Sequence, residues 1–108
     1  MTSEVDRSLL DESRLLAATW APVLQALGHP ERLLIVLWLA GTASSVRELE
    51  HVTGLGQSLV SYHLKALRDA GLVTATVHGR ANLYQLAHPD LDKLGHLVGN
   101  LARSQVVD

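Results

Sequence analysis

The chain of 108 residues contains no cysteine and no phenylalanine, and only 4% of its residues are aromatic. The lack of cysteine excludes disulfides, thiolate nucleophiles, zinc fingers and thiol redox sensing. Leucine supplies the apolar bulk instead, with 22 copies. Because hydrophobic residues still make up 47% of the sequence, we expect a packed globule rather than a disordered chain.

Long apolar runs and a general excess of positive charge are also missing. The most apolar run, Leu33 to Ala40, spans 8 residues, whereas a membrane span needs about 20. The acidic N-terminus lacks the basic start and apolar core of a secretory signal. We therefore expect a soluble, cytoplasmic protein with no membrane partner. The net charge of −2 excludes a chain that is basic throughout, but it allows a local basic patch.

The length indicates a single domain over residues 1–108, because domains typically have about 100–150 residues. A domain this short has difficulty burying enough surface by itself. The sequence contains no dinucleotide fingerprint, phosphate loop, nucleophile elbow or HExxH motif. We therefore rank an enzyme last among the possible functions and predict that the protein is not one.

Apolar residues that recur at gaps of three and four predict a first helix within residues 1–27, with Ser3 near its start as a cap. Pro22 conflicts with one unbroken helix, so we expect either a kink or a restart capped by Thr19. A second helix over residues 30–40 is apolar almost all round, which is typical of the buried centre of a small domain.

Residues 45–70 predict a helix-turn-helix, with Ser45 capping a short helix and the glycines of TGLG forming the turn. The period then changes to two over residues 72–86, which indicates a β-hairpin. A last helix is expected over residues 89–104. A helix-turn-helix followed directly by a hairpin is a winged helix, so we predict a mainly α fold with one small hairpin.

The helix that starts at Gln57 has an apolar side that must pack on the core and an opposite side of hydroxyl, amide and cationic groups. Such groups reach base edges and phosphates in a major groove. Arg80, at the hairpin tip, suits a phosphate or the minor groove. Between Gln57 and Asn82 three basic residues and one acidic residue give a local charge of +2. The predicted DNA contacts are Gln57, Ser58, Ser61, Tyr62, Lys65, Arg68 and Arg80. The alternative is a solvated helix face.

The histidines divide into structural and undecided positions. His63 lies about 60° from the apolar stripe of its helix, so we expect it to be packed and hydrogen-bonded rather than to read a base. His29 precedes Pro30 and is expected to cap the second helix or to lie in a turn. His51 is expected to face solvent, and His78 is equally compatible with a DNA contact and a plain turn residue.

Three segments, LGHPERLLIVLWLA, VRELEHVTGLGQSLVSYHLKALRDAGLV and GRANLYQL, resemble the ArsR/SmtB family of bacterial repressors. The similarity covers residues 24–101 and is most specific over residues 57–73. It implies a homodimeric winged helix on a palindromic operator, and many members of the family release DNA when a metal ion binds. It also implies that the first and last helices form the dimer interface. The resemblance places four residues at DNA-reading positions: Gln57, Ser58, Ser61 and Tyr62.

An apolar stripe on the last helix supports a dimer independently, because no later element of the chain could cover it. A small domain with a spare apolar stripe gains stability by pairing. The alternative is that this stripe packs on the first helix of the same chain. With the first helix included, the predicted interface residues are Leu9, Leu16, Leu91, Leu94, Val98 and Leu101.

The metal sites of the family match this sequence only in part. Its cysteine ligands in the third helix correspond to Ser45 and Arg47, which excludes a sensor of thiophilic metals at that site. Its other site, on the last helix, is Asp-x-His, then ten residues, then His-x-x-Glu. This chain offers His88 and Asp90 in reversed order and lacks the second pair.

A different group of ligands lies at the start of the last helix, where His88, Asp92 and His96 are spaced four apart and lie near one another. Imidazoles with carboxylates suit nickel, cobalt or zinc. We predict a nickel or zinc site formed by His88, Asp90, Asp92 and His96. An ordinary exposed pair of Asp92 and His96 is the alternative.

The sequence therefore favours a DNA-binding transcriptional regulator, and we expect it to act as a repressor. Its expected partners are an operator DNA and a second copy of the chain. Control by nickel or zinc is one form of this hypothesis. In the other, the same module lacks metal control and is gated by a co-regulator protein, by a small ligand or by nothing. A winged helix used only for protein contact is a third hypothesis, and the positive charge around the hairpin argues against it.

Overall fold

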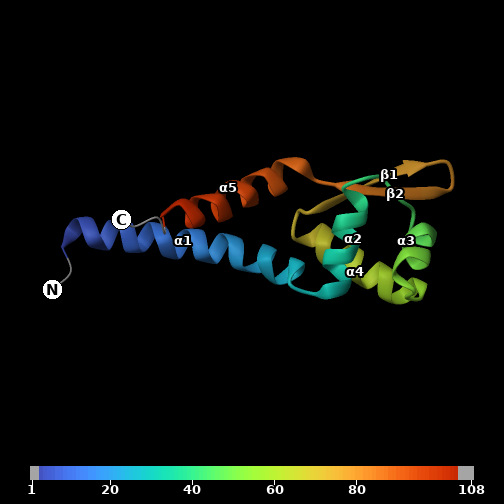
Figure 1. Cartoon of the computed structure of the whole chain (residues 1–108), viewed down its shortest axis with the longest axis horizontal. Helices are drawn as coiled ribbons and strands as arrows, with labels where there is room; N and C mark the ends of the chain where they lie inside the picture. The colour runs from blue at the N-terminus through green and yellow to red at the C-terminus, as the bar shows by residue number, and fades with distance from the viewer. Residues whose placement is uncertain (1–2, 105–108) are drawn as a thin grey trace.

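The computed structural model describes residues 3–104, apart from the side chains of Val5, His88, Asp90 and Ser104. Five helices and one two-stranded antiparallel sheet make up this part of the chain (Figure 1). The fold is a winged helix-turn-helix, as predicted. In chain order its elements are α1 (Glu4–Leu27), α2 (Pro30–Leu39), α3 (Val46–Thr53), α4 (Gln57–Asp69), β1 (Val73–His78), β2 (Ala81–Leu86) and α5 (His88–Ser104).

Helix α1 is a single element of 24 residues with Pro22 inside it, so the predicted restart at Thr19 is wrong. Ser3 caps the helix by accepting a hydrogen bond from the backbone N–H of Asp6 at 3.1 Å. Thr19 is an interior residue, since its hydroxyl donates to the carbonyl of Leu15 at 2.8 Å. Proline removes one N–H donor and crowds one carbonyl. The helix nevertheless continues through Pro22 to Leu27.

The core lies between α2, α3, α4 and the base of the hairpin. Helix α2 buries Ile35, Val36 and Leu39 in it. Its other side stays exposed, with Leu37 66% accessible, so the expectation that α2 is buried all round is wrong. Outside α2, the largest fully buried apolar side chains are Leu49, Val60, Leu64, Leu67, Leu72 and Val73.

The helix-turn-helix begins with a capping box. The hydroxyl of Ser45 accepts from the N–H of Glu48, and the Glu48 carboxylate accepts from the N–H of Ser45, both at 3.2 Å. Gly54 ends α3 with φ of +73°, a left-handed conformation that glycine adopts without a steric penalty. The chain turns there and enters α4, whose direction is thereby set relative to α3.

The hairpin pairs β1 with β2 in register from Val73–Leu86 to His78–Ala81. Its base is tied to the core, because Ser44 and Tyr84 exchange backbone hydrogen bonds at 3.0 and 2.8 Å. Its tip projects from the domain (Figure 1). The hairpin is therefore a wing with an anchored base beside the helix-turn-helix.

The molecule is elongated, with extents of 60 × 27 × 21 Å and a radius of gyration of 17.5 Å. A compact domain of this size has a radius of gyration of about 13 Å. The excess comes from α1, which extends far beyond the winged portion, with α5 running beside it (Figure 1). Among residues 3–104 there is no helix with the length and apolar character needed to cross a membrane.

Candidate nucleic-acid interface

Helix α4 separates its two faces as the helical periodicity predicts. Val60, Leu64 and Leu67 are buried in the core. The opposite face is exposed and carries six of the predicted DNA contacts, namely Gln57, Ser58, Ser61, Tyr62, Lys65 and Arg68. The structure therefore gathers these side chains on one open surface, although their role in DNA binding stays a prediction.

One of the cations on this face already has an ionic partner. The ammonium of Lys65 lies 2.8 Å from the carboxylate of Asp69, one helical turn away, and both side chains are largely exposed. Exposed pairs of this kind contribute little stability because water and salt screen them. Lys65 can therefore exchange Asp69 for a phosphate at small cost.

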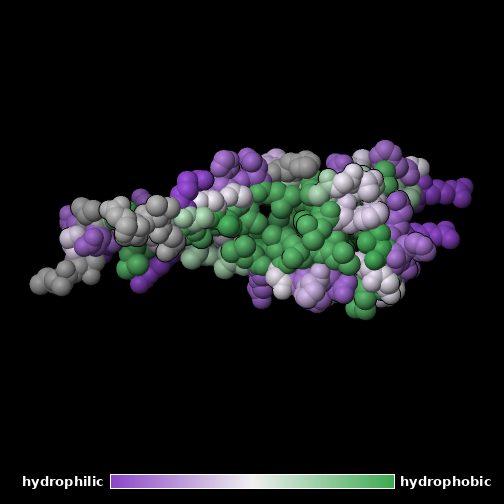
Figure 2. Space-filling model, viewed as in Figure 1, coloured by the Kyte–Doolittle hydropathy of each residue, from purple (hydrophilic) through white to green (hydrophobic). Residues whose placement is uncertain are grey.

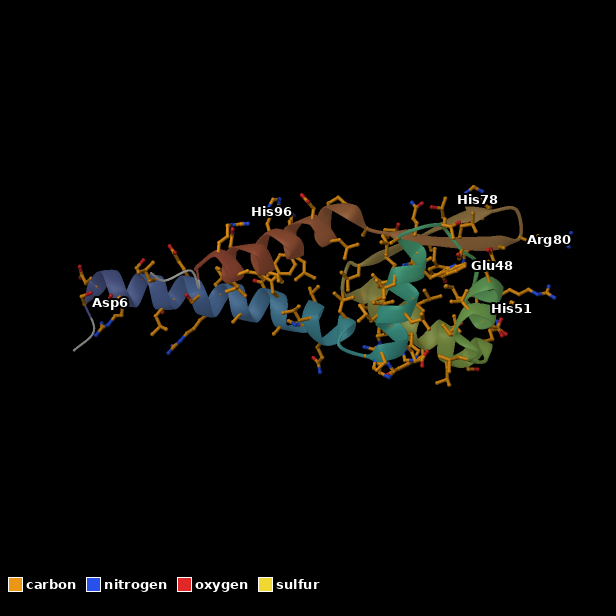
Figure 3. The ribbon with its side chains drawn as sticks, in the orientation of Figure 1. Asp6, Glu48, His51, His78, Arg80 and His96 are labelled. Carbon is orange, nitrogen blue, oxygen red and sulfur yellow. The ribbon has the colours of Figure 1, made fainter. Side chains whose placement is uncertain are left out.

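Arg80 lies at the tip of the wing, in the turn that Gly79 closes with φ of +62°. Its side chain is exposed and points away from the rest of the molecule (Figure 3). His78 is exposed on the adjoining strand, and His51 is exposed on α3, as expected for His51. Arg80 is thus free to reach a groove or phosphate next to the one that α4 would meet.

The wing, α3 and the start of α4 enclose a groove of about 470 Å³ that the sequence did not reveal. Arg47 brings a cation to it, Asn82 of the wing brings an amide, and Glu50 brings a carboxylate. In a helix-turn-helix the first helix crosses the DNA backbone, so this rule points to Arg47 of α3 as a candidate phosphate contact. The groove is lined by Ser45, Val46, Arg47, Glu50, Gln57, Ala81 and Asn82.

The start of α4 borders the same groove and differs from the starts of α1, α2 and α3, each of which has a side-chain cap. Its N-cap is Gly56, which offers no side chain to the first-turn N–H groups. Such N–H groups lie at the positive end of the helix dipole and can bind an anion. With Arg47 nearby, a DNA phosphate suits this corner.

Behind the exposed face, His63 is 4% exposed and packed among its neighbours, which confirms the expectation for this residue. Its Nδ1 accepts a hydrogen bond from Nε of Arg32 at 3.2 Å. Burial lowers the pKa of His63 below its usual value, and the nearby His29 and Arg32 lower it further, while Glu31 opposes the shift. The imidazole of His63 is therefore neutral at neutral pH.

His29 caps α2, as predicted, with Nδ1 accepting from the N–H of Glu31 at 3.2 Å. Its ring lies 4.6 Å from the ring of His63, centroid to centroid. The junction between α1 and α2 therefore packs directly against the buried side of α4.

A second surface, the α1–α5 groove, is apolar and has a volume of about 380 Å³. Figure 2 shows apolar side chains gathered over the middle of the molecule, where α1 approaches α2 and α5. Four of the predicted dimer residues, Leu9, Leu16, Val98 and Leu101, are exposed, whereas Leu94 is buried and Leu91 packs against the core. The groove is lined by Ser13, Leu16, Ala17, Trp20, Ala21, Leu24, Leu97 and Leu101.

The predicted metal ligands are described only in part. Oδ2 of Asp92 and Nε2 of His96 lie 3.6 Å apart, and both side chains are largely exposed. The side chains of His88 and Asp90 lie outside the described residues. Among the side chains that are described, no three His, Asp or Glu residues converge as metal ligands. The four-residue site therefore stays a prediction.

Comparison with known proteins gives consistent matches. Residues 29–75 match the family model for bacterial regulatory proteins of the arsR family. The HTH-type transcriptional regulator YgaV of Escherichia coli is 40% identical over 67 residues, which cover 61% of this chain and 68% of YgaV. The HTH-type transcriptional repressor SmtB of Mycobacterium tuberculosis is 43% identical over 79 residues, which cover 68% of this chain but only 58% of SmtB.

The fold has a close counterpart among solved structures. The homodimeric winged helix-turn-helix DNA-binding domain of a Mycobacterium bovis protein (fragment 1–100) aligns with a TM-score of 0.66 and 30% sequence identity. The alignment covers 99% of this chain and 93% of that domain. Because the alignment covers nearly the whole chain, it includes α1. The matched domain is a homodimer.

Proposed function

Because this chain belongs to the ArsR family of bacterial regulatory proteins, whose members are transcriptional regulators and not enzymes, we propose that it represses transcription by binding a palindromic operator as a homodimer. The observation that carries the proposal is the single surface formed by the exposed face of α4, the wing tip and Arg47. It concentrates positive charge in a chain whose net charge is −2.

In this mechanism α4 enters the major groove of the operator. The side chains of Gln57, Ser58, Ser61 and Tyr62 face base edges, since amides and hydroxyls read the donor and acceptor pattern there. Lys65 and Arg68 meet phosphates on the flank of the helix, and Arg80 reaches the neighbouring minor groove or its phosphates. Arg47 and the uncapped start of α4 hold a further phosphate.

The proposed homodimer is supported by the apolar surface of α1 and α5 that one chain leaves exposed. Helix α1, about 36 Å long at 1.5 Å per residue, presents Leu9 and Leu16, and α5 presents Val98, all at least half exposed. We propose that a second copy covers these residues together with Leu101, while the partly buried Leu91 and the buried Leu94 support α5 from within the protomer. A two-fold axis then places two copies of α4 on half-sites one turn apart, about 34–36 Å, or a multiple.

The test is fluorescence anisotropy with duplex DNA selected by the full chain from a random pool. We expect Arg80→Ala, Lys65→Ala and Arg47→Ala each to weaken binding and to lower the slope of log affinity against log salt by about one. Arg14→Ala removes the same charge from the exposed part of α1 and serves as the control. Unchanged affinity in all three variants would disprove the proposed DNA surface.

We further propose that nickel or zinc controls operator binding through the start of α5. Asp92 and His96 would supply a carboxylate and an imidazole, and His88 and Asp90 would complete the set. These donors suit both metals, and the separation of 3.6 Å between Asp92 and His96 lets one ion contact both side chains. A bound ion would stabilise one arrangement of the two protomers.

Titrating nickel, zinc and cobalt into the same anisotropy assay tests this control. We expect a metal-dependent change in operator affinity that disappears in the double variant His88→Ala, His96→Ala. An intact protein that responds to none of the three metals would refute metal control. The remaining alternatives would then be control by a co-regulator protein, control by a small ligand, or no effector.

A further inference from the structure

One side chain of α2 contacts two consecutive residues of α4 that point in different directions. The Nε of Arg32 donates to Nδ1 of the buried His63 at 3.2 Å. The guanidinium carbon of Arg32 lies 5.6 Å from the ring centroid of Tyr62, which is 60% exposed on the candidate DNA face. Arg32 therefore links the buried side of α4 to its open side.

The chemistry of these contacts suits arginine and no other cation. Because Nδ1 of His63 accepts, the imidazole is neutral and carries its proton on Nε2. The flat guanidinium can donate from Nε while its face covers an aromatic ring within the range of a cation–π interaction. A lysine ammonium is a single point of charge and cannot hold both residues in this geometry.

We propose that Arg32 is a positioning residue for DNA recognition. By holding His63 from one side and the Tyr62 ring from the other, it fixes the rotation of α4 about its axis and the direction in which Tyr62 faces DNA, without touching DNA itself. The proposal rests on the proposed DNA binding, and it extends the recognition surface to a residue of α2 that does not belong to the helix-turn-helix.

The groups around His63 make this contact sensitive to protons. The titratable and charged groups facing it are His29, Glu31 and Arg32 from α2 and its N-cap, and Tyr62 from α4. A protonated His63 has no lone pair on Nδ1, so it cannot accept from Arg32 and repels it. Oε2 of Glu31 is buried without a hydrogen-bond partner among the described residues, and the charge of this carboxylate favours the protonated form of His63. Acid should therefore break the hydrogen bond between Arg32 and His63 and leave only the contact with Tyr62 to hold Arg32 on α4.

The first experiment measures DNA affinity by anisotropy with the full chain and the selected duplex, at a temperature where circular dichroism shows every variant folded. We expect Arg32→Ala to bind about 10-fold more weakly, the effect of losing one hydrogen bond to a charged group. Arg32→Lys should lose nearly as much DNA affinity as Arg32→Ala, although lysine keeps the positive charge. The salt slope should stay unchanged in both variants, and Arg14→Ala should bind like the wild type.

The second experiment follows affinity from about pH 7.5 to about pH 5.5 in the wild type and in His63→Gln, with His63→Asn as the substitute if the glutamine variant does not fold. Either amide offers Arg32 an acceptor that does not titrate. We expect near wild-type affinity for the variant at neutral pH. The ratio of wild-type to variant affinity should fall as the pH drops below 6.5, the ordinary pKa of histidine. Histidines that lie away from His63 are common to both proteins and cancel in this ratio.

Three results would overturn the proposal. Wild-type affinity in Arg32→Ala would show that the contact does not position α4. A salt slope lowered by about one in Arg32→Ala, with affinity kept in Arg32→Lys, would make Arg32 a direct phosphate contact. A flat affinity ratio would disconnect His63 from recognition. If the wild type binds no duplex at all, the proposed function fails as well, whereas these three results leave it standing.

Discussion

Two polar residues, Ser44 and His63, are buried in the part of the chain that the structure describes. Each is satisfied by a partner from another segment. The hydroxyl of Ser44 accepts from the indole N–H of Trp38 at 2.9 Å, and the ring of His63 accepts from Arg32. Buried polar groups are costly when unpaired, so these two contacts fix how α2 sits against the wing and against α4.

His63 should make the stability of the domain depend on pH. Its pKa in the folded protein is lowered, so the unfolded chain binds the proton more readily than the folded one. The free energy of unfolding must then rise with pH in this window. We expect the stabilising contribution to be complete above pH 6.5 and to be lost as the pH falls toward the folded pKa.

Urea unfolding at a series of pH values, at one protein concentration, measures this dependence. His63→Gln should flatten the part of the profile below pH 6.5, because glutamine does not titrate. Identical profiles for the two proteins would show that His63 takes up its proton equally well in the folded and unfolded states.

At the scale of elements, α3 shows how a short helix is stabilised by its ends. It has only 8 residues, and isolated helices of that length are marginal in water. The capping box at Ser45 and the left-handed Gly54 close its two ends, and Leu49 anchors its middle in the core. The position of α3 matters because it borders the groove that contains Arg47.

Removal of the cap should therefore be measurable. We expect Ser45→Ala to lower the free energy of unfolding by about 1 kcal/mol, the usual effect of losing an N-cap side chain. Ser8→Ala, on the exposed surface of α1, is the matched control and should change stability little. Equal losses for the two variants in urea unfolding would argue against a stabilising role for the capping box.

At the scale of the whole molecule, the chain combines a packed winged portion with a long arm of α1 and α5. The arm exposes leucines along its length, and its apolar groove opens to solvent. Exposed apolar surface of this extent is typical of an interface. In the proposed dimer, the length of the arm would set the distance between the two α4 helices, so assembly and the spacing of the DNA half-sites would be coupled.

A charge placed in the groove should separate the protomers. We expect Leu16→Glu to shift sedimentation velocity from dimer to monomer and to weaken operator binding, because a buried carboxylate without a partner is strongly unfavourable. Val77→Glu, at a 74% exposed position of the wing, adds the same charge away from the arm and should remain dimeric. A dimeric Leu16→Glu would place the interface elsewhere.

The order of the elements, the two faces of α4 and the burial of His63 follow from the sequence alone, because helical periodicity, caps and glycine turns act between residues a few positions apart. Only the tertiary structure decides which apolar stripes find cover inside one chain. Leu94 is buried while Leu37 of α2 is exposed, against expectation. Likewise, Arg47 and the wing line one groove, and Arg32 contacts His63, 31 positions away. Such contacts depend on how whole elements pack, which no local pattern of residues encodes.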